Sequence, residues 1–237
     1  MSSGAGPLIV KQLWRYPVKS MLGEACASLR VDARGVEGDR LYAVRDAKGR
    51  LGSGKNSGWL RQIDGLLGFR ASSANGAISL VFPDGRTMSA SDAGINAALS
   101  AALGQSVTLV KESDVAHFDS GAIHILTTAS LAWLSQALPD GEADARRFRA
   151  NLLIEVAGSS PVEQQWPGRT LLLGERLKLR VTDATERCRM VTLAQAELPE
   201  DPRVLREITR QQEAQFGVYA EVLEPGELRV GDPVRLA

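Results

Sequence analysis

The pattern of hydrophobic and polar positions along the chain predicts many short strands. Brief apolar or alternating runs are separated by Gly, Pro, Asn and Asp positions, which is typical of strands joined by turns. Residues 69–89 form a small meander in this interpretation, because Asn75-Gly76 and Pro83-Asp84-Gly85 supply turn signals. The segments with strand character are 8–16, 27–31, 40–45, 69–72, 77–82, 86–89, 107–110, 123–126, 152–156, 171–173, 177–181 and 216–219.

Other segments have the spacing of helices. Apolar positions within residues 91–104 recur with helical period, with Ser91 as the expected N-cap and Gly104 as the stop. A second helix is expected over residues 130–138, and Asp201-Pro202 opens another that runs to about residue 215. Strands and helices together predict an α+β fold that is β-rich and barrel-like.

Length and composition restrict the class of protein. The 237 residues can form one large core or two small ones. The 28 basic and 28 acidic residues cancel, which argues against a partner such as nucleic acid or an acidic membrane. Two cysteines are too few for a disulfide framework, so a reducing compartment is expected. No apolar run has the length of a membrane span and residues 1–6 lack signal-peptide character, so we expect a cytoplasmic protein.

The segment around Cys188 is the first candidate for chemistry. Cys188 lies between Arg187 and Arg189, after the expected strand 177–181. Neighbouring guanidinium groups favour the thiolate, which is the form that binds metals and attacks electrophiles. The structural alternative is a small buried cysteine with exposed arginines on either side. The other cysteine, Cys26, is expected to be a small strand residue.

Cationic residues gather near the ends of other expected strands. Lys19 and Ser20 follow the first strand, and Arg40 opens the third. Arg149 and Asn151 would alternate onto one face of an extended segment, so both could point at one ligand. The alternative for the arginines before this strand is a solvated edge.

Weaker signals come from threonines and histidines. Thr127 and Thr128 lie where a strand gives way to a helix, a position that binds anions but more commonly serves as a cap. His117 and His124 are the only histidines, and neither has a partner at metal-ligand spacing. We expect His117 to be an exposed loop residue and His124 to lie in a strand.

Residues 49–55 match the pattern G-x-x-x-x-G-K, with Asn56 where a nucleotide loop needs Ser or Thr. Such a loop also needs a helix directly after it, but Gly58 interrupts the following residues. We therefore favour a loop at the surface or at the rim of an active site over a nucleotide site.

Taken together, five short runs resemble the MOSC family, named for the C-terminal domain of molybdenum cofactor sulfurases. The similarity is greatest to the two-part branch that includes the mitochondrial amidoxime-reducing component and its bacterial relatives. The runs, in the family's order, are Tyr16-Pro17-Val18-Lys19-Ser20, Gly38-Asp39-Arg40, Arg147-Phe148-Arg149-Ala150-Asn151, Arg187-Cys188 with Thr192, and Phe216-Gly217-Val218-Tyr219 with Pro225-Gly226 and Val230-Gly231-Asp232-Pro233-Val234.

The resemblance implies a MOSC-type β-barrel with a smaller N-terminal α/β part and a few flanking helices. The polar stretch 113–121 is the expected boundary, with a MOSC N-terminal β-barrel-like part over residues 7–113 and a MOSC domain over residues 114–237.

The resemblance also implies a molybdenum–pyranopterin (molybdopterin) cofactor with Cys188 as the metal ligand. Residues matching Lys19, Ser20 and Arg40 would meet the phosphate of this cofactor, and those matching Arg149 and Asn151 would line the pterin. No flavin, haem or iron–sulfur signature is present. Further candidates for cofactor contact are Thr127, Thr128, Arg147, Arg187 and Thr192, with Asp183 and Thr192 as outer groups around the metal.

The implied activity is reduction of a small N-hydroxylated or N-oxide-type molecule, with electrons from a separate reductase. Two alternatives stay open: a module that binds or delivers the cofactor without turnover, and a sulfur carrier that uses a Cys188 persulfide. The chain lacks room for a pyridoxal-phosphate desulfurase domain. Thr185 and Ala150 stand where relatives often have Cys and Pro, so the substrate is left unspecified.

Overall fold

The computed structural model describes residues 7–237. Residues 1–6, on which the expectation of no signal peptide partly depends, lie outside the described residues. The elements are β1 Leu8–Arg15, β2 Glu24–Cys26, β3 Ser28–Asp32, β4 Gly35–Val36, β5 Tyr42–Asp46, β6 Leu51–Ser53, β7 Leu60–Gln62, η1 Leu66–Gly68, β8 Arg70–Ala74, β9 Ala77–Val81, β10 Thr87–Ser89, α1 Ile95–Leu103, β11 Val107–Lys111, β12 Ile123–Thr127, α2 Thr128–Ala137, η2 Ala145–Phe148, β13 Leu152–Glu155, η3 Val162–Gln165, β14 Thr170–Leu173, β15 Leu177–Glu186, η4 Arg189–Thr192, α3 Pro202–Gln212, β16 Gln215–Glu224, β17 Gly226–Arg229 and β18 Pro233–Leu236.

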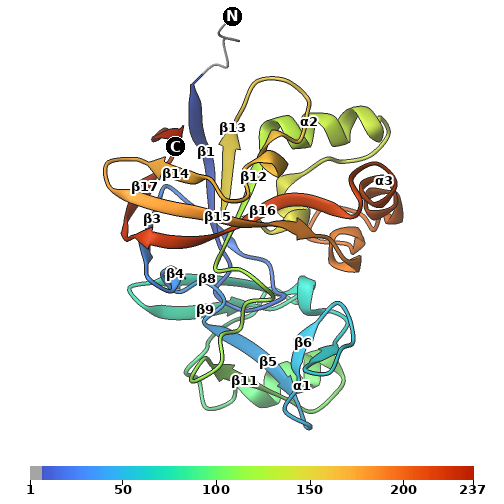
Figure 1. Ribbon diagram of the computed structural model, residues 1–237. Helices are drawn as coiled ribbons and strands as arrows, with labels where there is room; N and C mark the ends of the chain where they lie inside the picture. Colours follow the sequence, from blue (N-terminus) through green and yellow to red (C-terminus); the bar gives the residue numbers. More distant parts are fainter. Residues whose placement is uncertain (1–6) are drawn as a thin grey trace, which may run out of the picture.

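A closed β-barrel forms the upper part of the molecule in Figure 1. Its strands follow the order β13-β12-β16-β15-β14-β18-β1, and β1 closes the ring by pairing with β13 as well as β18. Closure leaves no unpaired edge in this ring, which removes the usual liability of a sheet. The predicted β-rich, barrel-type α+β fold is confirmed.

The barrel core follows from the alternation seen in its strands. In β15, Leu177, Leu179 and Val181 are buried, whereas Lys178 and Arg180 between them are exposed. Burying an aliphatic side chain of this size stabilises the folded state by about 1.5–3 kcal/mol. The inward face of each strand therefore supplies much of the free energy that holds the barrel together. β15 continues past the expected end at residue 181, because β16 pairs along its whole length.

The N-terminal part is built on smaller sheets. A sheet in the order β11-β5-β6-β7 packs beside the meander β10-β9-β8, and α1 covers their shared core. This meander lies where the turn signals predicted it. The N-cap of α1 is Gly94, so the expectation for Ser91 was wrong: Ser91 interacts with Ser89 in a turn that precedes the helix. Gly104 ends α1 with a φ of 64°, as predicted.

The two parts exchange strands. β1 comes from the first residues of the described chain but belongs to the barrel otherwise built from residues 123–236. Conversely, β17 pairs with β3 in a small sheet that continues to β4. The chain therefore crosses several times between the two parts. The division into residues 7–113 and 114–237 stays a prediction.

His117 differs from its expected position. Its side chain is only 1% exposed, although it was predicted to be an exposed loop residue. Its backbone N–H donates to Glu112, and its carbonyl oxygen accepts a hydrogen bond from Lys19 Nζ, so the loop is held inward at both points. His124 lies in β12, as expected.

Among residues 7–237, no helix has the length and apolar character needed to cross a membrane.

Candidate functional site

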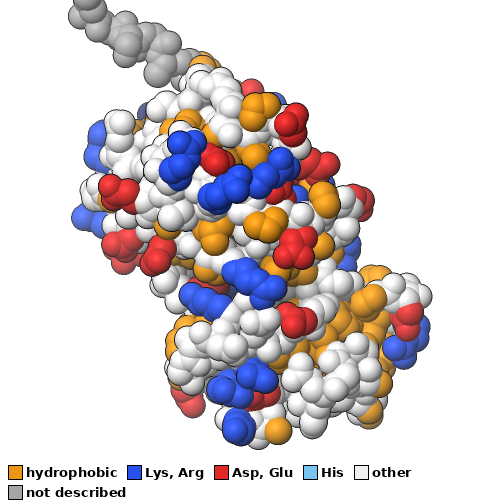
Figure 2. All heavy atoms as spheres, turned by 90° about the vertical axis from the view of Figure 1, so that its right-hand side faces the viewer, with side chains coloured by type: hydrophobic (Ala, Val, Ile, Leu, Met, Phe, Trp, Pro, Cys, Tyr) orange, Lys and Arg blue, Asp and Glu red, His pale blue; other side chains and the backbone are white. Residues whose placement is uncertain are grey.

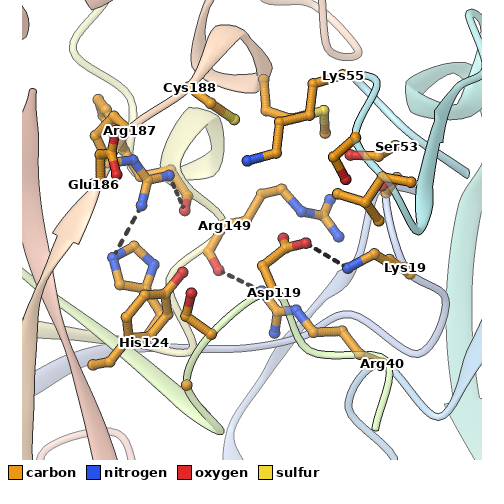
Figure 3. A pocket seen from close by; sticks show the side chains of 18 of the residues that line it. Lys19, Arg40, Ser53, Lys55, Asp119, His124, Arg149, Glu186, Arg187 and Cys188 are labelled. Atoms are coloured by element: carbon orange, nitrogen blue, oxygen red, sulfur yellow. Dashed lines mark hydrogen bonds and ion pairs between the residues drawn. The ribbon is translucent and has the colours of Figure 1, made fainter. Parts of the chain in front are cut away.

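A cavity of about 590 Å³ lies where the two parts meet. The N-terminal part contributes the segment after β1 and the loop after β6, while the barrel contributes the end of β15 and the residue after η2. Figure 3 shows its side chains converging from these different elements. Seven of the predicted site residues line it, namely Lys19, Ser20, Arg40, Arg149, Asp183, Arg187 and Cys188.

Lys19 is the most enclosed cation of the N-terminal side. Its side chain is 3% exposed and its Nζ donates to Asp119 Oδ1 at 2.6 Å and to the His117 carbonyl oxygen at 2.8 Å. Burial lowers the pKa of Lys19, and the Asp119 carboxylate partly offsets this by stabilising the ammonium. Asp119 was not predicted from the sequence, because nothing local distinguishes it from other polar residues of its loop.

Arg40 is held by a buried acidic partner. It forms an ion pair with Asp39, which is fully buried and also accepts the Tyr16 backbone N–H at 2.7 Å. Arg40 Nη2 donates to the Arg149 carbonyl oxygen at 3.1 Å, and Nη1 lies 3.4 Å from the amide oxygen of Asn151. Asn151 does not line the cavity, so it contributes by positioning Arg40.

Tyr16 supports the two central guanidinium groups. Its ring centroid lies 5.1 Å from Arg40 Cζ and 4.3 Å from Arg149 Cζ. Such cation–π contacts help to hold cations that burial would otherwise destabilise. Burial also raises the pKa of Tyr16 to about 12, so its hydroxyl stays protonated.

Arg149 reaches the cavity by a route that the sequence did not predict. The residue was expected in an extended segment, but it has a φ of 56° and ends η2, with its N–H bonded to the Arg146 carbonyl oxygen. Its Nη1 donates to the Met21 carbonyl oxygen, while its Nη2 is buried without a partner. Burial lowers the pKa of Arg149 to about 10, and Arg40 nearby acts in the same direction. A buried cation with a free donor is suited to receive an anion.

Cys188 lies at the barrel side of the cavity. It follows β15 and precedes η4, and its side chain is half-buried. Bulges where β15 pairs with β16 turn successive residues of this strand toward the cavity, including Asp183 and Glu186. Of the two arginines that flank Cys188, Arg187 lines the cavity, whereas Arg189 is exposed and does not.

Arg187 is fixed by neutral partners. Its Nη2 donates to the Phe148 carbonyl oxygen at 2.9 Å, and its Nη1 lies 3.4 Å from His124 Nε2. Burial and the neighbouring Arg187 hold the pKa of His124 well below its usual value, so the imidazole is neutral and can accept from the guanidinium. Arg187 Nε is buried without a partner. Like Arg149, Arg187 keeps an unused donor beside the cavity.

Besides Asn151, four predicted site residues lie outside the cavity. Thr127 caps α2 and hydrogen-bonds the buried carboxylate of Glu163. Thr128, Arg147 and Thr192 each donate to backbone carbonyl oxygens. The capping alternative is therefore confirmed for Thr127, whereas Thr128 bonds to the Val156 carbonyl oxygen instead of capping α2.

The loop after β6 was interpreted from its glycines as a surface or rim loop. No helix follows β6, which excludes the arrangement of a nucleotide loop. Lys55 and Ser57 of this loop and Ser53 at the end of β6 line the cavity, so the loop lies at the rim of the cavity. Lys55 is a further cation that the sequence did not single out for the site. The charged residues lining the cavity are Lys19, Arg40, Lys55, Arg149 and Arg187, together with Asp119, Asp183 and Glu186.

The sequence and structure were compared with known protein families and solved structures. The sequence matches the MOSC domain over residues 112–235 and the MOSC N-terminal beta barrel domain over residues 8–140. The crystal structure of the YUAD protein from Bacillus subtilis is similar with a TM-score of 0.56 and 13% identity, covering 98% of this chain and 97% of that chain. YiiM from Escherichia coli gives a TM-score of 0.45 and 11% identity over 99% of this chain and 70% of that chain. No curated protein shows significant sequence similarity to the chain.

Proposed function

The chain belongs to the MOSC family, and on that premise we propose that the cavity binds a molybdenum–pyranopterin cofactor for the reduction of small N-hydroxylated compounds. The single observation that carries this proposal is that the buried Arg149 guanidinium, which has an unpartnered donor, lines the same cavity as a half-buried cysteine thiol. An anionic group and a thiol-binding metal are the two features that such a cavity can hold together.

The cationic residues fit the phosphate of the cofactor. Lys19, Arg40 and Arg149 come from three different segments and surround the Asp119 carboxylate, whose pKa each of them lowers. A phosphate in the place of this carboxylate would receive hydrogen bonds from Arg149 Nη2 and Lys19 Nζ. Asn151 and Tyr16 would keep the two arginines in position.

On the barrel side, Cys188 would supply the protein's thiolate ligand. Thiolate suits a soft metal that is already bound to sulfur. Arg187, with its unpartnered Nε, would stabilise negative charge beside that ligand. When bound, the cofactor would supply two-electron redox chemistry at the metal.

The overall reaction would consume two electrons and two protons, cleave the N–O bond and release water. The electrons would come from a separate reductase, since the family resemblance supplies no other donor. The chain's own residues would bind the substrate in the remaining space of the cavity and orient its N–O group toward Cys188. The cytoplasmic location also stays a prediction.

The test is the molybdenum and pterin content of protein purified from a host that makes the cofactor. We expect near-stoichiometric molybdenum in the wild type, loss of the metal in Cys188→Ala, and loss of both metal and pterin in Arg149→Met. Cys26→Ala is the matched control, because Cys26 lies in β2 and does not line the cavity. A loaded wild type should reduce an N-hydroxylated amidine with a chemical electron donor.

Other outcomes would replace this proposal with one of the alternatives. Bound molybdenum without turnover for any donor would indicate a binding or delivery module. Absence of metal and pterin, with a persulfide mass shift on Cys188, would indicate a sulfur carrier. Full molybdenum content in Cys188→Ala would refute the assignment of the ligand.

A further inference from the structure

A second hollow adjoins the cavity and has a different chemical character. This groove has a volume of about 590 Å³ and lies between η1 and the segment that follows η4. Its wall includes Leu22, Ile63, Leu66, Leu67 and Leu193. Figure 2 views this side of the molecule and shows hydrophobic side chains gathered where the upper and lower parts meet. The cavity beside it is lined by five Lys and Arg side chains, whereas the groove has one, so the two spaces differ in charge.

The two spaces share a wall. Ser20, Ser53 and Met190 line both of them. The three charged residues of the groove are Asp64, Arg189 and Glu200, and all are exposed, whereas Ile63, Leu66 and Leu67 are buried. A molecule bound near Cys188 could therefore extend from the cationic cavity into the groove and lie against these aliphatic side chains.

Met190 is the largest of the three side chains that line both the cavity and the groove. It lies two residues after Cys188 and reaches the opposite wall, because a Cβ added at Gly54 would lie only 2.3 Å from Met190 Sδ. Gly54 has no positive φ, so close approach of Met190 is the reason that this position suits glycine. A thioether side chain has three rotatable bonds and adapts readily to a neighbouring ligand.

We propose that the groove is a subsite for the apolar part of the substrate and that Met190 determines which substrates can enter it. The inference rests on the proposed function, and it adds that the substrate class consists of compounds with a polar N–O head and an apolar alkyl or aryl tail. The head lies beside Cys188 and the tail lies against Leu66, Leu67 and Leu193. Each methylene that enters the groove increases affinity up to about fourfold, the effect of burying one such group.

Two series of probes test the subsite. In the first, the KM of loaded enzyme is measured for N-hydroxylated alkyl amidines of increasing chain length. In the second, the affinity of unloaded protein for n-alkyl monophosphates of increasing chain length is measured by calorimetry, which needs neither metal nor turnover. We expect KM to fall and affinity to rise with chain length until the groove is filled.

Substitutions in the groove test whether the dependence of KM and affinity on chain length arises there. Leu193→Gln should flatten the dependence on chain length in both series, whereas Leu223→Gln should leave it as in the wild type. Leu223 is 47% exposed and lines neither space, which makes it a matched control. Gly54→Ala should change the preferred chain length by displacing Met190. In a Met190→Ala background, Gly54→Ala should cause no further shift, since the contact between the two residues no longer exists.

The outcomes separate this inference from the proposed function. Turnover without any dependence on chain length, or an equal dependence in Leu193→Gln, would overturn the subsite while leaving the reductase proposal intact. Affinity for alkyl phosphates that rises with chain length, in a protein that neither holds molybdenum nor reduces amidines, would support the subsite and refute the reductase.

Discussion

Lys19 and Asp119 are separated by 100 residues and form an ion pair of 2.6 Å inside the cavity. The lysine side chain is 3% exposed and the aspartate side chain is 56% exposed, so the pair joins a fixed cation to an accessible carboxylate. Arg40 and Arg149 also lower the pKa of Asp119. This carboxylate occupies the place where the cations would receive an anionic ligand.

Asp119→Asn is therefore expected to increase the affinity of the unloaded protein for inorganic phosphate. Removing a competing carboxylate from a cationic cavity should contribute about 1–2 kcal/mol, or roughly 5- to 30-fold in affinity. Calorimetric titration with phosphate measures this directly. Asp183→Asn is the control, because Asp183 lines the same cavity and has no ion pair among the described residues. An affinity unchanged by Asp119→Asn would show that the pair does not compete with the ligand.

Arg149→Met should separate stability from binding. The Arg149 guanidinium is buried with a free donor, and burying a charge without an ionic partner is costly, so an apolar side chain of similar length should be neutral or stabilising here. Arginine and methionine must both adopt the φ of 56° at this position, so backbone strain is the same in the wild type and the variant. The difference in stability then reports on the guanidinium group. We expect an equal or higher free energy of unfolding in urea, together with loss of phosphate binding. A large decrease in stability would mean that Arg149 has a structural role in the unloaded protein.

Asp39→Asn should destabilise the fold. Asp39 is fully buried and its partner Arg40 is 14% exposed, so the substitution leaves a mostly buried guanidinium without its counter-charge. The expected loss is about 3 kcal/mol, measured as the free energy of unfolding in urea. Asp84→Asn is the matched control, because the Asp84–Arg86 pair is more than half exposed and should contribute little. Equal midpoints for both variants would contradict a structural role for the buried pair.

Glu163 predicts a dependence of stability on pH. Its carboxylate is fully buried with Thr127 and Ser130 hydroxyls as partners, and burial raises the pKa of Glu163 above the ordinary value of 4.5. A raised pKa means that the folded state retains a proton that the unfolded chain has lost. The stability associated with this group is therefore fully present below pH 4.5 and is lost as pH rises through the folded-state value.

Glu163→Gln should remove this dependence. Urea unfolding of wild type and variant, at a series of pH values from about 4 to 8, gives the difference in unfolding free energy. We expect the variant to gain stability relative to the wild type as pH increases. A difference that stays constant over this range would show that Glu163 does not keep its proton in the folded state.

The element types were largely predictable because burial repeats within a few residues. The alternation of Leu177, Leu179 and Val181 predicts a strand whichever strand it pairs with. Gly104 ends α1 because its backbone is left-handed. Similarly, Asp201 and Pro202 specify the start of α3 through contacts within one turn. Lys19, Arg40, Arg149 and Cys188 were recognised as site candidates from short runs of sequence.

Contacts between distant residues had no such local signal. Closure of the barrel requires β1 to pair with β13, which brings Ile9 opposite Glu155. The interpretation of Arg149 as part of an extended segment was wrong, because η2 ends in a left-handed residue that turns the side chain toward the cavity. Asp119 and Met190 acquire their positions only when loops from both parts of the molecule meet.

The sequence by itself therefore determined the longer strands, several helix ends and the chemical types of the candidate site residues, since these depend on interactions between near neighbours; the short strands β2, β4, β6, β7, β17 and β18 were not predicted. Only the tertiary structure decided which charges meet, which donors stay unpartnered, and how an apolar groove adjoins a cationic cavity. Those properties depend on distances between segments that are far apart in the chain, and such distances are set by the packing of the whole fold.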